Sequence, residues 1–282
     1  MDTGREAGVC ERHIVPVFHG RPTIRPTVLV TKPLTKSCIA ALESRFEVVS
    51  LVGGDDPEAV LASHGEAVRA VAGGKVRADL MARLPNLEII ANEGVGVDTT
   101  DVPAARARGI AVTNTPDVLN DAVAELAVAL MLALARQVPQ ADRFVREGKW
   151  LGGAFPLGSQ LLGKTVGILG LGRIGKGIAK RLSAFGMEIA YCGRNPQADQ
   201  PHRYFADLAE MAEASDWLVV IAPGGAGTDR IVSRAVLEAL GPKGRLVNVA
   251  RGSLVDQDAL IELLRNGRLG GAALDVYANE PN

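Results

Sequence analysis

The feature that most constrains this chain is a glycine-rich loop, 170–175, that follows a short apolar run. The run, 165–169, has the β-branched character of a buried strand, and the loop reads Gly-Leu-Gly-Arg-Ile-Gly. Residues 173–185 then have helical spacing, and a second β-branched run follows at 188–191. A strand, a glycine turn, a helix and a second strand form the arrangement of a dinucleotide-binding unit.

Each glycine of this loop has a predicted task. Gly170 allows the tight turn, Gly172 lets the backbone approach a pyrophosphate, and Gly175 lets the helix pack closely on the strand. The free N–H groups at the start of the helix would face the anion. The predicted cofactor-binding residues of the loop are Gly170, Leu171, Gly172, Arg173, Ile174 and Gly175. A plain glycine turn is the alternative.

The end of the second strand indicates which dinucleotide binds. An NAD site usually carries an acidic residue here, about 20 positions on, which accepts a hydrogen bond from the ribose 2′-hydroxyl. This strand instead leads into Gly193, Arg194 and Asn195, without Asp or Glu. An arginine attracts a 2′-phosphate, and Gly193 leaves room for it. We predict NADP(H), with NAD as the alternative cofactor and a solvated surface arginine as the alternative interpretation of Arg194.

The rest of the chain alternates short β-branched runs with longer Ala-, Leu- and Glu-rich stretches. The expected strands are 28–31, 47–52, 67–71, 87–91, 110–112, 165–169, 188–191, 217–221, 245–249 and 272–276. The expected helices are 35–45, 57–63, 77–83, 100–108, 121–136, 173–185, 207–214, 233–240 and 257–265. This alternation predicts an α/β fold of two Rossmann-like or flavodoxin-like parallel-sheet domains, with a cleft between them.

The length of 282 residues fits about two domains. We expect an N-terminal extension without order at 1–26, because it is polar and has no period. A first parallel-sheet domain, 27–117, would follow, and a dinucleotide-binding domain would occupy 118–282. The helix at 121–136 is apolar on nearly all sides, so we expect it to be buried between domains or between subunits.

Composition excludes several classes of partner. The net charge of −1 gives no basic field for nucleic acid and no polybasic tract for a membrane surface. The three cysteines lack metal-ligand spacing, which predicts free thiols in a reducing cytoplasm and no metal site. No secretion signal is visible, and the longest apolar run, 126–135, is too short to span a bilayer.

Ligands of open parallel sheets bind beyond the carboxyl ends of the strands. In the second unit this rule selects Ala222, Pro223, Val249, Ala250, Arg251 and Asp275. An arginine can hold a carboxylate bidentately and polarise a neighbouring carbonyl, which suits a 2-keto acid. For Arg251 a structural ion pair is the alternative. In the first unit, the small residues at 92–98 indicate a nest of backbone N–H groups for an anion, or else an ordinary turn.

Taken together, these motifs resemble the D-isomer-specific 2-hydroxyacid dehydrogenases over about 27–282. The matching segments are 94–98, 114–116, the glycine loop, 249–253 and 274–277 with 280–281. Arg251 and Glu280 are 29 positions apart, as the catalytic Arg and Glu of that family usually are. The segments 193–195 and 223–228 look like the branch of NADP-using glyoxylate/hydroxypyruvate reductases.

The resemblance implies that 27–117 is the substrate (catalytic) domain, with its C-terminal return segment absent from this sequence. It also implies roles for individual residues. Val95 and Gly96 would bind the substrate carboxylate through backbone N–H groups, and Arg251 would bind the carboxylate and the keto oxygen. Asp275 would contact the nicotinamide carboxamide. Glu280 would orient a histidine and raise its pKa, so that the histidine donates a proton. The implied reaction reduces a small glyoxylate- or hydroxypyruvate-like 2-keto acid to the D-2-hydroxy acid, in a homodimer formed through the cofactor domain.

The histidines depart from the family pattern. The catalytic histidine of the family lies beyond the glutamate in a Pro-His segment, whereas this sequence ends at Asn282. Its histidines are His13, His19, His64 and His202, and none is expected to serve. Either the sequence is a piece of a longer product, or it is a natural short form without proton transfer. Since general acid catalysis contributes ~10²–10⁴ in rate, we expect it to bind NADPH but to turn over slowly.

Two other functions stay open. One is a dinucleotide-binding sensor or scaffold without turnover, although the presence of both Arg251 and Glu280 counts against it. The other is an NAD-dependent enzyme of the phosphoglycerate dehydrogenase type, and the missing acidic residue after Tyr191 counts against that.

Overall fold

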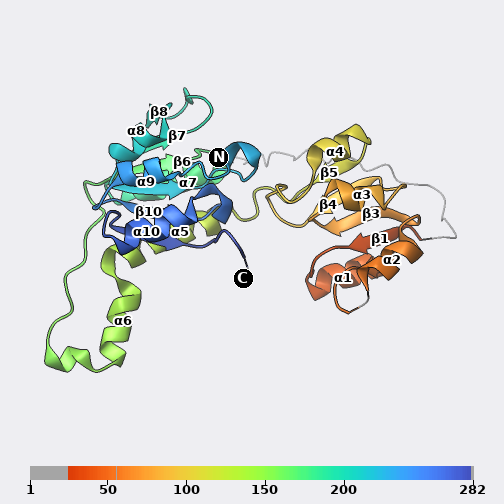
Figure 1. The fold of residues 1–282 in the computed structure, drawn as a ribbon, viewed down its shortest axis with the longest axis horizontal. Helices are drawn as coiled ribbons and strands as arrows, with labels where there is room; N and C mark the ends of the chain where they lie inside the picture. Colours follow the sequence, from red (N-terminus) through yellow and green to blue (C-terminus); the bar gives the residue numbers. More distant parts are fainter. Residues whose placement is uncertain (1–24, 55, 281–282) are drawn as a thin grey trace, which may run out of the picture.

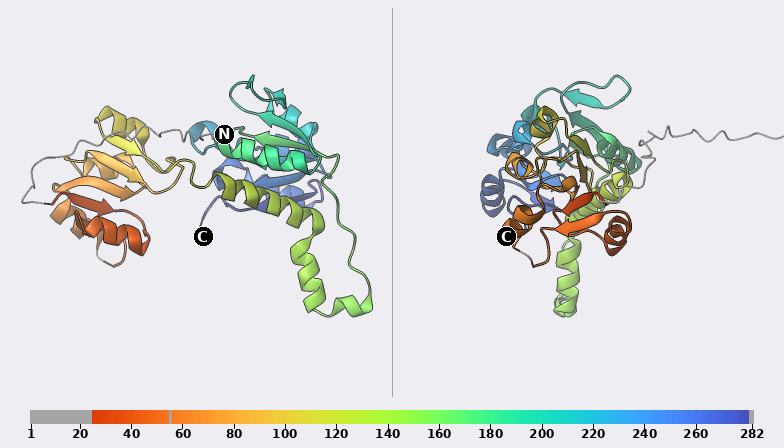
Figure 2. Two further views of the ribbon diagram at one scale, coloured as in Figure 1. Left: turned by 180° about the vertical axis from the view of Figure 1, so that it is seen from behind. Right: turned by 90° about the vertical axis from the view of Figure 1, so that its right-hand side faces the viewer.

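The computed structural model describes residues 25–54 and 56–280, and it contains two separate parallel β-sheets (Figure 1). The predicted extension at 1–26 lies almost wholly outside the described residues. Figure 2 shows that the two sheets, each with its helices, lie side by side along the long axis of the molecule. The prediction of an α/β fold with two parallel-sheet units is confirmed.

The first sheet has the strand order β2-β1-β3-β4-β5, and every pair is parallel. Its strands are β1 (Thr27–Val30), β2 (Glu47–Ser50), β3 (Val68–Gly73), β4 (Ile89–Asn92) and β5 (Ala111–Thr113). Its helices are α1 (Lys36–Glu43), α2 (Pro57–His64), α3 (Ala78–Ala82) and α4 (Val102–Ala107). The order 2-1-3-4-5 is that of the flavodoxin-like doubly wound fold.

The second sheet has the order β11-β10-β9-β6-β7-β8, again all parallel. Its strands are β6 (Thr165–Leu169), β7 (Glu188–Cys192), β8 (Arg203–Phe205), β9 (Trp217–Val220), β10 (Arg245–Asn248) and β11 (Gly271–Leu274). Its helices are α5 (Asn120–Arg136), α6 (Val138–Arg146), α7 (Arg173–Ala184), α8 (Leu208–Glu213), α9 (Arg234–Leu240) and α10 (Gln257–Arg265). The order reverses between β6 and β9, the place where dinucleotides bind in Rossmann folds.

The central strand β9 explains why this unit has two cores. Its side chains alternate between the two faces of the sheet, as the period of two requires. Trp217 and Val219 pack with α5 and α7, whereas Leu218 and Val220 pack with α8, α9 and α10. All four strand residues are fully buried. Helices therefore cover both faces, as the continuous apolar runs predict.

The expected elements agree with the structure apart from their ends and two omissions. The sequence pattern did not predict β8, which has three residues at the edge of the sheet, and it did not predict α6. α6 begins directly after Gln137, whose left-handed conformation (φ 53°) ends α5. A proline in the first turn suits a helix start, because its missing N–H has no partner there.

Helix α5 is buried on one face only. Ala124, Ala127, Met131 and Ala135 pack into the second unit, whereas Leu126 is exposed. Within one chain α5 is therefore buried on one face only, and its expected burial between subunits stays a prediction. Among the described residues no single helix is long and apolar enough to cross a membrane. The bent pair α5 and α6, which meet at 55°, reaches that length and composition only together.

Residues 138–160 form an arm that projects away from the second sheet (Figure 2). The arm consists of α6, a 3₁₀ turn at Lys149–Gly152 and an extended return. An edge-to-face contact between Phe144 and Phe155, with ring centroids 5.3 Å apart, joins its two sides. It exposes five large apolar side chains, Val138, Val145, Trp150, Leu151 and Leu157.

Candidate functional site

The glycine loop connects β6 to α7 at the carboxyl edge of the second sheet. Gly170 has a φ of 99°, and a Cβ there would lie 2.9 Å from the backbone of Ala222. A Cβ at Gly175 would strike the carbonyl oxygen of Gly170, so helix and strand can pack this closely only with glycine. A Cβ at Gly172 would meet nothing within 4 Å, which leaves open space beside the helix N-terminus.

This geometry fits a pyrophosphate. The first N–H groups of an α-helix have no partner within the helix, and in α7 these include Arg173 and Ile174. The positive end of the helix dipole lies at the same place. Arg173 also pairs with Asp117 at 3.2 Å, in the connection between the two sheets. The residues present therefore suit a dinucleotide phosphate, although which atoms bind it stays a prediction.

The loop after β7 carries the residues predicted to select the cofactor. Arg194 and Asn195 are exposed there, and Gly193 is half-buried. One hydrogen bond ties this loop to the glycine loop, and a second ties it to β7. The Gln197 amide donates to the Leu171 carbonyl at 2.8 Å, and the Gln197 N–H donates to the Tyr191 hydroxyl at 2.7 Å. Arg194 belongs to this loop, which follows the strand whose end contacts the ribose in dinucleotide-binding folds.

The other predicted residues of the second unit gather on the same edge. Ala222 and Pro223 follow β9, Val249 to Arg251 follow β10, and Asp275 follows β11. Asn248 had no predicted role, but it is 1% exposed and shapes the turn after β10. Its amide donates to the Arg251 carbonyl at 2.9 Å, and its Oδ1 accepts from the Ala250 N–H at 3.0 Å. A buried amide at the end of an apolar strand was the signal for this role.

Arg251 reaches across to the first unit and pairs with Asp98. Its Nε donates to Oδ2 and its Nη2 donates to Oδ1, each at 3.1 Å. Burial alone would raise the pKa of Asp98. The hydrogen bonds and charge of Arg251, with a smaller effect of Arg77, nevertheless hold that pKa below its ordinary value. The structural ion pair weighed for Arg251 therefore exists, and it lies at the predicted substrate site.

The loop 94–98 follows β4 at the carboxyl edge of the first sheet. Gly94 has a φ of 135°, and its N–H donates to the Thr115 hydroxyl at 3.0 Å. The Asn114 amide donates to the Val95 carbonyl at 2.8 Å. Within the described residues no acceptor is found for the N–H groups of Val95 and Gly96. This is the arrangement that backbone binding of a carboxylate needs.

Glu280 lies on an exposed segment that follows β11. Its carboxylate accepts from the N–H of Tyr277, and the Ala278 N–H donates to Gln257 Oε1 at 3.0 Å. A Cβ at Gly252 would overlap the backbone of Tyr277, so the segment crosses directly over the turn after Arg251. The predicted catalytic pair therefore comes from adjoining segments.

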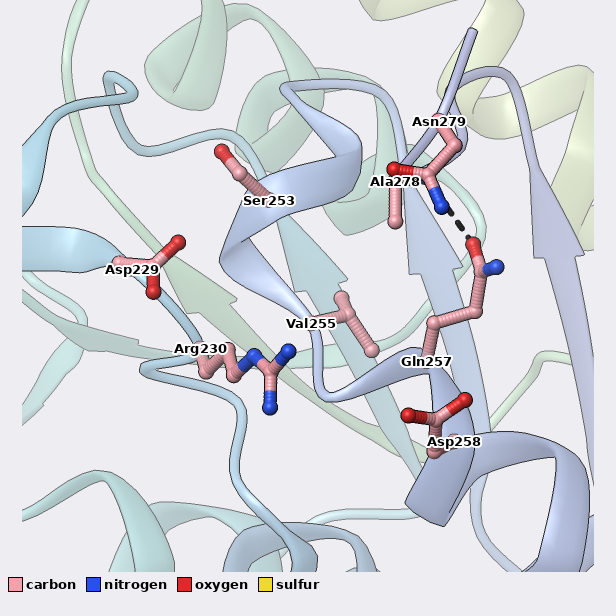
Figure 3. Close-up of a pocket in the computed structure, with 8 residues that line it drawn as sticks. All are labelled: Asp229, Arg230, Ser253, Val255, Gln257, Asp258, Ala278 and Asn279. Atoms are coloured by element: carbon pink, nitrogen blue, oxygen red, sulfur yellow. Dashed lines mark hydrogen bonds between the residues drawn. The ribbon is translucent and has the colours of Figure 1, made fainter. Parts of the chain in front are cut away.

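A polar pocket of about 240 Å³ lies beside this segment (Figure 3). It is lined by Asp229, Arg230, Ser253, Val255, Gln257, Asp258, Ala278 and Asn279. None of these is a predicted site residue, and we assign no ligand to it. Within the described residues no cluster of His, Cys, Asp and Glu could hold a metal ion.

Neither described histidine lies at the strand ends that carry Arg251. His64 ends α2, and His202 precedes β8 at the far edge of the second sheet, where burial lowers its pKa. His13 and His19 lie outside the described residues.

Comparison with known proteins decides the family. The sequence model for the NAD-binding domain of D-isomer specific 2-hydroxyacid dehydrogenases matches residues 128–282. This chain belongs to that family. The resemblance inferred from the motifs is thus confirmed, and with it the assignment to the oxidoreductases.

Individual relatives of this 2-hydroxyacid dehydrogenase are named as reductases of 2-keto acids. An NADPH-dependent glyoxylate/hydroxypyruvate reductase from Sinorhizobium meliloti, solved with NADP and malonate, is 48% identical with a TM-score of 0.86. The match covers 92% of this chain and 81% of that one. A glyoxylate/hydroxypyruvate reductase of Arabidopsis thaliana is 44% identical over 90% of this chain and 82% of its own length. A 2-ketogluconate reductase of Gluconobacter oxydans is 40% identical over 92% and 83%.

Proposed function

We propose that this 2-hydroxyacid dehydrogenase uses NADP(H) to reduce a small 2-keto acid, of the glyoxylate or hydroxypyruvate type, to the D-2-hydroxy acid. The observation that carries the proposal is the position of Arg251. It lies at the carboxyl edge of the sheet that bears the glycine loop, and it reaches the loop 94–98 of the other sheet. The printed names of the relatives support the same substrate class and cofactor.

The residues divide the work by their chemistry. The N–H groups of Val95 and Gly96 bind one end of the substrate carboxylate, and the Arg251 guanidinium binds the carboxylate and the keto oxygen. Such contacts stabilise the negative charge that develops on the oxygen during reduction. Bound nicotinamide supplies the hydride, and Asp275 and the segments 222–223 and 249–250 lie where they can position it.

Arg194 gives the preference for NADP(H) in this proposal. Arg194 is exposed in the loop that follows β7 and that Gln197 ties to the glycine loop, and its guanidinium can form charge-assisted hydrogen bonds with a 2′-phosphate. NAD binding at the same loop is the weaker alternative, because no carboxylate ends β7.

Proton transfer is assigned only in part. We propose that Glu280 orients a histidine that donates the proton, as the family pattern implies. Neither His64 nor His202 has the position for this role. The residues described here bind the substrate and stabilise charge, and the proton comes from a donor other than these two histidines.

We further propose that residues 27–117 form the substrate domain and that residues 118–282 form the dinucleotide-binding domain.

We also propose that the protein is a homodimer in the cytoplasm, and we place the contact between the two copies on the dinucleotide-binding domain. The exposed apolar residues of the arm and of α5, such as Trp150, Leu151 and Leu126, support a contact there. The free thiols Cys38 and Cys192 fit a reducing compartment. Light scattering of the wild type and of Trp150→Ser tests the dimer, and cell fractionation tests the location.

The activity is tested by following NADPH oxidation with glyoxylate, hydroxypyruvate and a bulkier 2-keto acid. We expect oxidation that depends on the keto acid and is lost in Arg251→Ala. Binding of NADPH without oxidation by any of these acids, even in a single turnover, would favour a non-catalytic sensor and overturn the proposal.

A further inference from the structure

The side chain of Arg251 has one occupied edge and one open edge. A guanidinium carries five N–H groups. Nε and one N–H of Nη2 donate to the two oxygens of Asp98, and one N–H of Nη1 donates to the Ala250 carbonyl at 2.6 Å. One N–H on each Nη remains. Two N–H groups at the end of a guanidinium can bind two oxygens in parallel.

Two glycines restrict where this ion pair can lie. A Cβ at Gly96 would overlap Nη2 and come 2.6 Å from Oδ1 of Asp98. A Cβ at Gly224, in the loop after β9, would come 3.0 Å from Cγ of Arg251. The Arg251 side chain therefore passes so close to both loops that a side chain at Gly96 would overlap its guanidinium and one at Gly224 would crowd its alkyl part.

The environment of the pair argues against a mainly stabilising role. The Arg251 side chain is 45% exposed and that of Asp98 is 21% exposed. Ion pairs with this much solvent contact contribute little to folding. Bidentate geometry, in contrast, fixes orientation as well as charge, and a site for a planar 2-keto acid depends on orientation.

From this juxtaposition we infer that Asp98 is a positioning residue for substrate binding. It holds the side edge of the Arg251 guanidinium, so that the two end N–H groups face the substrate beside the N–H groups of Val95 and Gly96. The inference rests on the proposed function of Arg251 and adds to it a residue of the first sheet. The substrate site is then completed only when the two units meet through this pair.

The test measures binding of oxalate, a non-reducible dianion with the oxygen spacing of a 2-keto acid, to the NADPH-loaded chain by calorimetry. In Asp98→Ala we expect the Kd for oxalate to rise roughly 10- to 100-fold, as for loss of a charge-assisted hydrogen bond. Asp98→Asn keeps one acceptor oxygen and should give an intermediate rise. The Kd for NADPH should change less than about threefold in both, which also shows that the variants fold.

Gly96→Ala provides a second variant that keeps every charge. Its added Cβ displaces Nη2 from Asp98, so we expect a loss of oxalate binding similar to that of Asp98→Ala. Asp216→Asn is the matched control. Asp216 also has a lowered pKa and an ion pair, with Lys164 at 3.0 Å. It joins the amino ends of β6 and β9, at the edge of the sheet opposite to the one that carries Arg251. Its oxalate affinity should equal that of the wild type.

The outcomes distinguish failure of the positioning role of Asp98 from failure of the proposed function. Wild-type oxalate affinity in Asp98→Ala, with the NADPH affinity intact, would overturn the positioning role and leave the proposed function standing. A wild-type chain that binds NADPH but not oxalate would overturn both. A graded loss across Asn and Ala, with the control unchanged, supports the inference.

Discussion

The molecule has two glycine-rich turns at the carboxyl ends of parallel strands, and they are built differently. The loop 170–175 opens a helix of 12 residues, so its geometry and its charge come from its own segment. The loop 94–98 does not lead directly into a helix, because α4 begins only at Val102. It is completed instead by Arg251, which lies 153 positions away in the sequence. We therefore expect the first turn to bind a phosphate with its own helix, and the second to need Arg251 to bind its ligand.

The largest expected effect removes that partner. Arg251→Ala should lower kcat/KM for 2-keto acid reduction by roughly 10²–10³-fold or more, because it removes donors that face the developing oxyanion. The Kd for NADPH should stay within about threefold, since the glycine loop is untouched. Steady-state kinetics and NADPH titration measure the two separately.

Arg251→Lys sharpens this test. Lysine keeps the charge but cannot form the fork, so it should recover little of the lost kcat/KM. Full recovery by lysine would show that charge alone suffices and that the geometry with Asp98 is irrelevant.

The complementary change breaks the glycine loop. Gly175→Ala places a Cβ against the Gly170 carbonyl, so the Kd for NADPH should rise on the order of 100-fold and the melting temperature should fall. Gly172→Ala is its matched control, because the space around that Cβ is empty. It should keep the melting temperature and lose only dinucleotide affinity. Equal destabilisation in both variants would contradict the distinct tasks assigned to the two glycines.

A smaller effect is expected at the adenosine end. Arg194→Ala should raise the Kd for NADPH about tenfold and leave the Kd for NADH unchanged, because only NADPH carries the 2′-phosphate. Arg203, which stacks over the Phe205 ring at 4.4 Å, provides a control arginine whose replacement should affect neither. An unchanged Kd for NADPH in Arg194→Ala would mean that another group reads the phosphate.

The smallest effect concerns acid stability. Since Arg251 lowers the pKa of Asp98 in the folded chain, the pair stabilises the fold above the unfolded pKa, near 3.8. This contribution is lost as the pH falls from about 5 through the lowered pKa. Urea unfolding measures this effect. Between pH 7 and pH 3 the free energy of unfolding should fall more in the wild type than in Asp98→Asn, by at most ~1 kcal/mol. A larger loss in the variant would reverse the sign and refute the lowered pKa.

The two turns also show what the sequence could reveal. The glycine loop was predictable because every contact that shapes it lies within one strand–turn–helix unit. The pairing of Asp98 with Arg251 was not, because no local pattern links residues on two different sheets. Asp98 was visible in the motif 94–98 but had no role until the fold placed Arg251 beside it.

The missed elements have the same explanation. α6 is strongly amphipathic but packs on no sheet, so nothing in the strand–helix alternation calls for it. β8 has three residues and owes its pairing to β7, through Tyr204 opposite Tyr191. Asn248 is polar within a buried strand, and only the turn that it fixes explains it.

The most direct test of the central claim follows hydroxypyruvate reduction by the NADPH-loaded chain in a single turnover, with analysis of the chirality of the product. The account predicts that each NADPH consumed yields one D-glycerate, that NADH is the poorer donor, and that Arg251→Ala forms no product on the same timescale. Formation of the L-isomer, a preference for NADH, or equal NADPH consumption by the wild type and Arg251→Ala would contradict it.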